Sequence, residues 1–191
     1  MQALRATYTD TLKPALLNCL TRLKFIDEIG VHIGLTRLYG RAEPGVRVSE
    51  GTPGRSGTHY TVIAALGWSG PSEPLLIAGS MDRLVLDAYV EHELAPRLLA
   101  GDIVIWDNLS VHQSERARQL IEARGARLQF LPPYSPDMNP IELCWSKIKT
   151  ALRAAKARTL DALLDALATA LRSVTPADAQ AWFAHCGYTL A

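Results

Sequence analysis

Residues 102–132 constrain the fold of this chain more than any other stretch. DIVIWDN, at 102–108, is a continuous apolar run between acidic residues, which is typical of a central strand buried on both faces. Ser110 and Gln113 have the spacing of a capping box, Gly125 ends the helix that they predict, and ARLQFLP at 126–132 is a second strand. Because a strand, a helix and a strand with short connections form a parallel pair, this order predicts an α/β sheet.

The flanking sequence predicts strands before this unit and helices around it. The apolar or β-branched runs LKFIDEIG, YTVIAALGW and PSEPLLIAG predict strands at 23–30, 60–68 and 71–79. Residues 82–99 have the apolar spacing of a helix that Pro96 should distort near its end. Three further helices are predicted at 139–156, 159–173 and 176–186. We therefore expect a mixed sheet with helices on its faces and a helical C-terminal section.

Composition places the chain among ordinary globular proteins. Its 191 residues suit one compact domain, 48% of them are hydrophobic and 20% charged, and no apolar run approaches the length of a membrane span. The first twenty residues include Arg5, Asp10 and Lys13 and do not resemble a signal peptide, so we expect a cytoplasmic protein. Three widely spaced cysteines indicate reduced thiols, with neither a disulfide framework nor a zinc site.

Two predicted strands carry an aspartate at or near the carboxyl end, Asp27 and Asp107. Either residue could simply begin a turn, and Asp107-Asn108 is a good turn dipeptide. Ser110 already fills the cap position of the next helix, however, which leaves Asp107 without an evident structural task. Ligands of open α/β sheets gather at the carboxyl ends of the strands, so both aspartates are candidate site residues.

A third acidic residue follows the proline-rich stretch LPPYSPDMNPIELCW at 131–145. Asn139 suits a helix N-cap, Pro140 suits the first helical position, and Glu142 falls where a capping-box glutamate would sit. The same geometry suits a functional carboxylate, because a helix N-terminus favours the ionised form and the prolines fix its place. Both interpretations of Glu142 stay open at this point.

Charge is distributed unevenly, although the net charge is only +1. Residues 71–110 hold two basic and seven acidic residues, whereas residues 111–158 hold nine basic and four acidic ones. This order suits a metal centre beside a polyanion site, or merely two solvated helix faces of opposite sign. The predicted phosphate contacts, weak and sensitive to salt, are Lys147, Lys149, Arg153, Lys156 and Arg158.

If Asp27, Asp107 and Glu142 converge, their oxygens could hold two divalent ions roughly 3.5 to 4 Å apart, the arrangement used for in-line phosphoryl transfer. A ligand displaced by about 1 Å would lose that geometry, which gives the proline-rich stretch a reason to be rigid.

FIDE at 25–28, WDNLSVH at 106–112 and LPPYSPDMNPIELCW at 131–145 together resemble the bacterial insertion-sequence branch of the mariner-type DDE transposases. The order agrees, as does the spacing of thirty-four residues between Asp107 and Glu142, and the resemblance covers roughly residues 22–190. It implies an RNase H-like catalytic domain with Asp27, Asp107 and Glu142 as the acidic triad and two Mg²⁺ or Mn²⁺ ions as cofactors. Family members cut DNA at the element ends and join the 3′-hydroxyls to target DNA, and the resemblance implies a homodimer in the active complex.

Other residues match the family pattern less specifically. The resemblance suggests Asn108, His112 and Asn139 as supports around the metal or the DNA, and we do not place His112 on the metal. Glu28 should point to the sheet face opposite Asp27 and is expected to be structural. Residues 34–58, rich in glycine and proline, occupy the position of a loop that contacts the partner subunit in mariner-like enzymes, or form an ordinary surface loop.

We expect a connector at 1–21, whose apolar positions have no evident partner, and a catalytic domain at 22–191. Complete relatives begin with helix-turn-helix modules that this sequence does not supply, so end recognition is expected to come from a separate polypeptide or to be absent. Bound to DNA, such a protein would associate with the bacterial nucleoid. Two alternatives are a nuclease of the same fold that cleaves without joining strands, and a non-catalytic fragment that dimerises with a full transposase and inhibits it.

Overall fold

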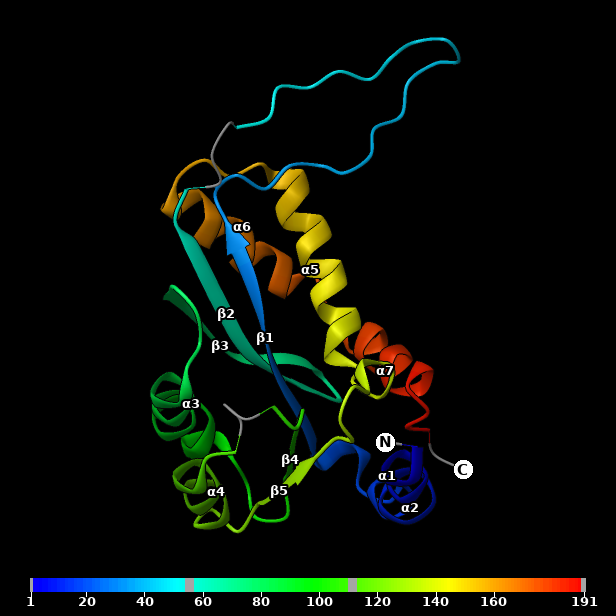
Figure 1. Ribbon diagram of the computed structural model, residues 1–191, viewed down its shortest axis with the longest axis vertical. Coiled ribbons are helices and arrows are strands. Elements are labelled where there is room, and N and C mark those ends of the chain that lie inside the picture. Colours follow the sequence, from blue (N-terminus) through cyan, green and yellow to red (C-terminus); the bar gives the residue numbers. More distant parts are fainter. Residues whose placement is uncertain (1, 54–56, 110–112, 190–191) are drawn as a thin grey trace.

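The computed structural model describes residues 2–53, 57–109 and 113–189, which form a five-stranded sheet in the order β3-β2-β1-β4-β5 (Figure 1). β1 pairs with β2 and β2 with β3 in antiparallel fashion, whereas β1 with β4 and β4 with β5 are parallel pairs. The predicted mixed sheet and its parallel unit are therefore confirmed. The strands are β1 Leu23–His32, β2 His59–Gly67, β3 Gly70–Ala78, β4 Ile103–Trp106 and β5 Arg127–Phe130.

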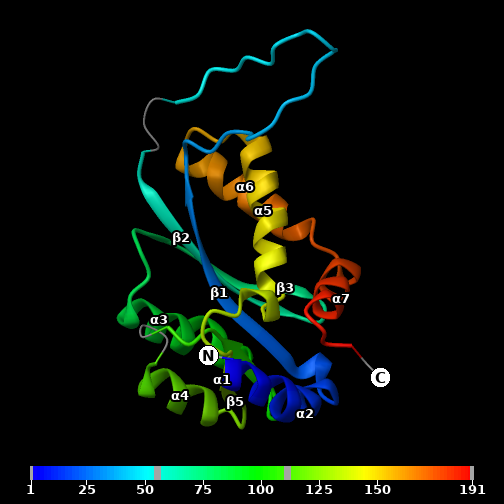
Figure 2. The ribbon, with the colours of Figure 1, turned by 45° about the vertical axis from the view of Figure 1, so that its right-hand side comes forward.

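Helices cover both faces of the sheet because the strand side chains alternate between two hydrophobic clusters. Phe25 and Ile105 belong to the cluster with α5, α6 and α7, and Ile26 and Val104 to the cluster with α3 and α4. Figure 2 shows α5 running alongside β1, with α7 near the C-terminus. The helices are α3 Arg83–Tyr89, α4 Glu115–Glu122, α5 Ile141–Ala155, α6 Leu160–Arg172 and α7 Pro176–His185.

The helix predicted at 82–99 is regular only as far as Tyr89, since π-helical Val90–Leu94 and 3₁₀-helical Ala95–Arg97 follow. This change confirms the distortion expected at Pro96. α4 begins later than predicted: its cap is Ser114, whose Oγ accepts a hydrogen bond from the Ala117 amide at 3.2 Å. The predicted cap Ser110 lies outside the described residues. Gly125 follows the helix with φ of 72°, as its predicted role at the helix end requires.

The N-terminal segment packs on the core, although its sequence suggested no partner. It consists of α1 Gln2–Thr7, a π-helical turn Tyr8–Leu12, α2 Lys13–Leu17 and a 3₁₀ turn Leu20–Arg22. Tyr8, Leu16 and Leu20 are at most 3% exposed and belong to the same cluster as Phe25. The boundary predicted between residues 21 and 22 therefore does not separate two cores.

The segment between β1 and β2 extends away from the body of the molecule in both views (Figures 1 and 2). Its ends are held by the C-terminal end of α5 and the residues after it. Lys156 pairs with Glu50, and the Arg158 guanidinium donates to the carbonyls of Ile33 and Leu35 at 3.0 Å. None of the described helices combines the length and apolarity needed to span a bilayer.

Candidate active site

The pairing of β1 with β4 brings Asp27 and Asp107 together. Phe25 lies opposite Ile105 in this parallel pair, so continuing the register by two residues places Asp27 level with Asp107. Asp27 is in the middle of β1 and not near its end as predicted, because β1 continues along β2 as far as His32 after β4 has stopped. The pairing of β1 with β4 ends at Phe25 and Ile105, and both aspartates lie two residues beyond this end.

Asp107 begins a turn, as one of the two interpretations of its sequence predicted, so the expectation that it has no structural task was wrong. One of its carboxylate oxygens accepts a hydrogen bond from the Leu109 amide at 3.2 Å, which is an Asx turn. The neighbouring Asn108 accepts a hydrogen bond from the Gln113 side chain at 2.8 Å through its Oδ1. The turn fixes the direction in which Asp107 leaves β4, and this does not exclude a functional role for its carboxylate.

The third carboxylate comes from the start of α5, but the predicted capping box does not form. α5 begins at Ile141, its N-cap is Pro140, and no side chain caps it. The Glu142 amide donates instead to the backbone carbonyl of Asn139 at 3.2 Å. The structural role that the sequence offered for Glu142 is therefore absent, since a Pro140 cap leaves the Asn139 side chain outside the helix.

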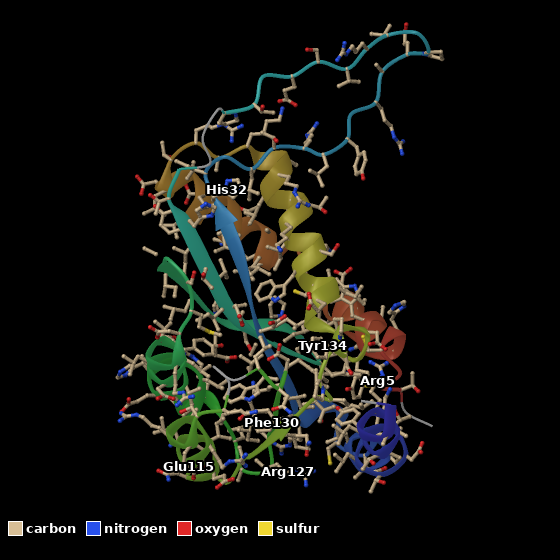
Figure 3. All side chains as sticks on the ribbon, viewed as in Figure 1. Arg5, His32, Glu115, Arg127, Phe130 and Tyr134 are labelled. Carbon is tan, nitrogen blue, oxygen red and sulfur yellow. The ribbon has the colours of Figure 1, made fainter. Side chains whose placement is uncertain are left out.

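These carboxylates share one pocket of about 330 Å³ at the carboxyl ends of β4 and β5. Asp27 is partly buried, Asp107 is partly buried, and Glu142 is exposed at the start of α5. Figure 3 labels Tyr134, from the loop between β5 and α5 that also lines the pocket, and Arg5, from the N-terminal segment. The pocket is lined by Asp27, Asp107, Asn108, Leu109, Leu131, Pro132, Pro133, Tyr134, Ser135, Pro136, Asn139 and Glu142.

The electrostatics of the pocket favour a cation. Burial raises the pKa of Asp27 to about 8, and the negative charges of Glu28, Glu142 and Asp107 add to this shift, partly offset by a backbone hydrogen bond from Glu28. Every charged side chain that acts on Asp27 in this way is itself acidic. A divalent cation would relieve this repulsion, and carboxylate oxygens are the donors that Mg²⁺ and Mn²⁺ prefer.

Asn139 adds an uncharged oxygen to the same pocket. The residue is 4% exposed, and its Oδ1 has no hydrogen-bond partner among the described residues. Leaving a buried acceptor unpaired costs roughly 1 to 3 kcal/mol, so this oxygen suits a ligand or a water held by one. Within the described ranges, no three His, Cys, Asp or Glu side chains already surround one metal position. The donor set of carboxylates and one amide oxygen fits a divalent ion.

Comparison with known families shows the family of the chain. A model of the DDE superfamily endonucleases matches residues 22–164, which include Asp27, Asp107 and Glu142. This chain belongs to the DDE endonuclease superfamily.

Curated relatives of this chain are transposases. It is 29% identical over 102 residues to the Tc1 transposase of Caenorhabditis elegans, covering 51% of this chain and 37% of the relative. It is 31% identical over 106 residues to the Tcb2 transposase of Caenorhabditis briggsae, and this match covers 52% of this chain and 39% of the relative. The matched stretch thus spans about two fifths of the length of these relatives.

Solved structures give the fold. The Mos1 transposase in a paired-end complex with the left transposon end has a TM-score of 0.73 at 16% identity, covering 95% of this chain and 57% of that one. The catalytic domain of the Mos1 mariner transposase has a TM-score of 0.70 at 13% identity, and the match covers 95% of this chain and 86% of that domain's chain. The chain therefore has the RNase H-like fold that the sequence resemblance implied.

Three of the five basic residues that were predicted to contact phosphate are engaged in contacts within the protein. Lys147 pairs with Asp178 at 2.7 Å, and, as described above, Lys156 and Arg158 hold the segment after β1. These three of the predicted phosphate contacts have structural tasks. Lys149 and Arg153 make no hydrogen bond or ion pair within the described part of the chain, and Lys149 lies on the Glu142 side of α5, roughly 10 Å along the axis.

The remaining predicted residues are placed as follows. Asn108 and Asn139 line the pocket, while His112 lies outside the described residues. Glu28 shares the strand face of Ile26, opposite Asp27, because side chains alternate along β1. Tyr134 and Ser135 also line the pocket; they belong to the proline-rich stretch 131–145 but were not predicted as site residues.

Asp27→Asn is expected to stabilise the metal-free protein at alkaline pH. Because the folded-state pKa of Asp27, about 8, exceeds its ordinary value of 3.8, the native state binds the proton more tightly, and stability falls as pH rises from about 4 to about 8. Asparagine imitates the neutral acid and removes this loss. At pH 9 we expect the free energy of unfolding of the variant to exceed that of the wild type by about 1 to 2 kcal/mol, which corresponds to a melting temperature roughly 3 to 8 °C higher.

Thermal unfolding in a chelator between pH 5 and pH 9 would measure this difference. The difference in melting temperature between the variant and the wild type should be small near pH 5 and largest above pH 8. A gap that is constant with pH, or a variant less stable at pH 9, would contradict the assignment of this charge repulsion to Asp27.

Proposed function

We propose that this DDE endonuclease is the catalytic part of a transposase encoded by a bacterial insertion sequence, which cuts DNA at element ends and transfers the strands to a target. The observation that carries the proposal is the meeting of Asp27, Asp107 and Glu142, from two strands and one helix, at one acidic pocket. The relatives named as transposases, and the Mos1 structures titled paired-end and strand transfer complexes, support the substrate class. The bacterial origin is supported by the sequence motifs alone.

Mg²⁺ or Mn²⁺ is the proposed cofactor, and Mos1 paired-end complexes solved with Mn and with Mg support it. Asp27, Asp107 and Glu142 would hold the ions, with the Asn139 oxygen as a neutral donor or an acceptor for a bound water. Two such ions supply an activated attacking oxygen and a stabilised leaving oxygen in phosphoryl transfer.

The protein's own contribution is placement. Asp27 is fixed by its pairing with Ala64 of β2, Asp107 by its Asx turn, and Glu142 by the first turn of α5. The α5 N-terminus favours the ionised form of Glu142. Lys149 and Arg153, further along the same helix, would contact the phosphate backbone that leads away from the pocket, an interaction that weakens as salt rises.

Partners follow from the same proposal. We propose a homodimer in the active complex, with the extended segment between β1 and β2 as a contact, and residues 22–191 as the catalytic domain. Recognition of the terminal repeats would come from a helix-turn-helix polypeptide, and the protein would act in the cytoplasm at the nucleoid.

A strand-transfer assay tests the proposal. The protein is incubated with Mn²⁺, a supercoiled plasmid and a labelled duplex that ends in a free 3′-hydroxyl, and products are separated under denaturing conditions. Joining of the label to the plasmid supports a transposase. Plasmid nicking without joined label would show a nuclease of the same fold, and neither product at protein concentrations that bind DNA would contradict catalysis by this chain.

A further inference from the structure

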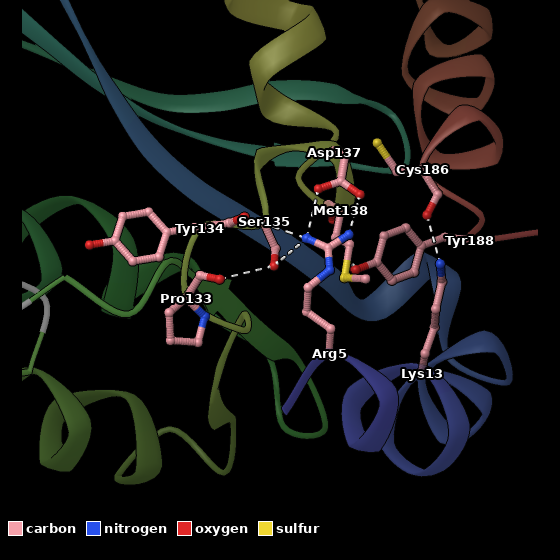
Figure 4. A network of polar contacts seen from close by, with 9 residues as sticks. All are labelled: Arg5, Lys13, Pro133, Tyr134, Ser135, Asp137, Met138, Cys186 and Tyr188. Atoms are coloured by element: carbon pink, nitrogen blue, oxygen red, sulfur yellow. Dashed lines mark hydrogen bonds and ion pairs between the residues drawn. The ribbon is translucent and has the colours of Figure 1, made fainter. Parts of the chain in front are cut away.

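The loop that precedes Glu142 is held by a residue far away in the sequence. The Arg5 guanidinium donates to both carboxylate oxygens of Asp137, at 3.0 and 2.6 Å, and to the Ser135 hydroxyl at 2.7 Å (Figure 4). It also reaches the backbone carbonyl of Tyr134 at 3.4 Å. Paired hydrogen bonds of this kind fix orientation as well as distance, which a single lysine contact does not.

A second contact from the N-terminal segment fixes the end of the same loop. The hydroxyls of Tyr8 and Tyr188 are 2.8 Å apart, and the Tyr188 hydroxyl donates to the backbone carbonyl of Met138 at 3.0 Å. Both tyrosines are at most 2% exposed. Met138 directly precedes Asn139, so this chain of hydrogen bonds ends next to the pocket.

The loop needs such support because its own backbone is strained. Tyr134 has φ of 54°, a left-handed conformation that costs a non-glycine residue free energy, and its side chain is 84% exposed and so packs on little. Residues 131–139 contain no strand, and their only regular element is the 3₁₀ turn Pro136–Met138. The contacts of Arg5 with residues 134, 135 and 137 span this strained part.

We propose that Arg5 and Asp137 are positioning residues for the acidic pocket. The N-terminal segment Gln2–Leu17 acts as a brace that holds the proline-rich loop, and the loop in turn sets the position of Asn139 and Glu142. The inference rests on the proposed function only in taking the pocket as a divalent-cation site. Arg5 lies outside the stretch 22–164 that carries the family match, so the family motifs do not account for it.

Arg5→Gln distinguishes two possible effects of Arg5 on cation binding, the positioning of the loop and the repulsion between its own charge and the cation. Removing a positive charge near an acidic pocket should tighten cation binding on Coulombic grounds, whereas loss of the brace should weaken it. We expect Arg5→Gln to raise the calorimetric Kd for Mn²⁺ about 5- to 10-fold, Arg5→Lys to raise it less, and Asp137→Asn to add little to Arg5→Gln, since both break the same contact.

Arg116→Gln is the matched control. The ion pair between Arg116 and Glu91 has the same length, 2.6 Å, as the pair between Arg5 and Asp137, but neither Arg116 nor Glu91 lines the pocket. This variant should leave the Kd unchanged. Amide hydrogen exchange provides a readout without metal: Arg5→Gln should speed exchange at residues 138–142, and Arg116→Gln should not.

Unchanged exchange at residues 138–142 in Arg5→Gln would overturn the proposal, as would an unchanged or lower Kd for Mn²⁺. A wild type that binds no Mn²⁺ would contradict the proposed function instead, and the exchange comparison would then decide the brace by itself.

Discussion

Asp107→Asn is expected to reduce Mn²⁺-dependent DNA cleavage by at least about 10²- to 10³-fold while leaving the fold intact. The substitution keeps the shape of the side chain and can preserve the turn contact with the Leu109 amide through its amide oxygen. It removes the negative charge that an ion would require. Cleavage of a supercoiled plasmid at a series of protein concentrations measures the effect.

Asp165→Asn is the control for this prediction, since Asp165 is an exposed carboxylate on α6 that does not line the pocket. It should cleave at the wild-type rate. Asp27→Asn and Glu142→Gln should lose activity as Asp107→Asn does, and Asp27→Asn should lose it while its melting temperature at pH 9 rises. Loss of activity that always accompanies unfolding would contradict a role in metal binding.

Trp145→Ala is expected to have the largest effect on stability. Trp145 is 2% exposed and lies in the cluster between α5 and the sheet, so its removal leaves a large cavity. The expected cost is about 3 to 5 kcal/mol, which corresponds to a melting temperature lower by roughly 6 to 15 °C for a domain of this size. Because Trp145 directly supports the helix that begins with Glu142, activity should fall at temperatures where the variant is still folded.

Trp145→Phe is the matched comparison. It keeps an aromatic ring and removes the indole N–H, which is buried and has no hydrogen-bond partner among the described residues. Removing an unpaired donor offsets part of the cavity cost, so the variant should be clearly more stable than Trp145→Ala. Equal destabilisation by both, measured by urea unfolding, would show that the cavity is not the cause.

The sequence predicted features that depend on local periodicity. The helix predicted at 139–156 is confirmed as α5, whose buried residues Ile141, Trp145, Ile148 and Leu152 recur with the helical repeat. The parallel pair β4 and β5 follows from strand, helix and strand in order, and is confirmed as well. Such patterns state which side of an element is apolar, and so which elements pack together.

Features that depend on distant contacts could not be predicted. Arg5 and Asp137 are 132 residues apart, and nothing near either residue indicates the pairing. Lys147 looked available for phosphate because its partner, Asp178, lies 31 residues away. Asn139 has an ideal residue type for a cap, but the helix begins one residue later than that role requires, and the side chain lies in the pocket instead.

The central claim is that Asp27, Asp107 and Glu142 form one divalent-cation site, and a calorimetric Mn²⁺ titration tests it most directly. DNA is left out, so the result reports on the pocket alone. The account predicts saturable binding to the wild type and to Asp165→Asn, and its loss in Asp107→Asn. Binding of equal affinity in Asp107→Asn, or no saturable binding to the wild type, would contradict it.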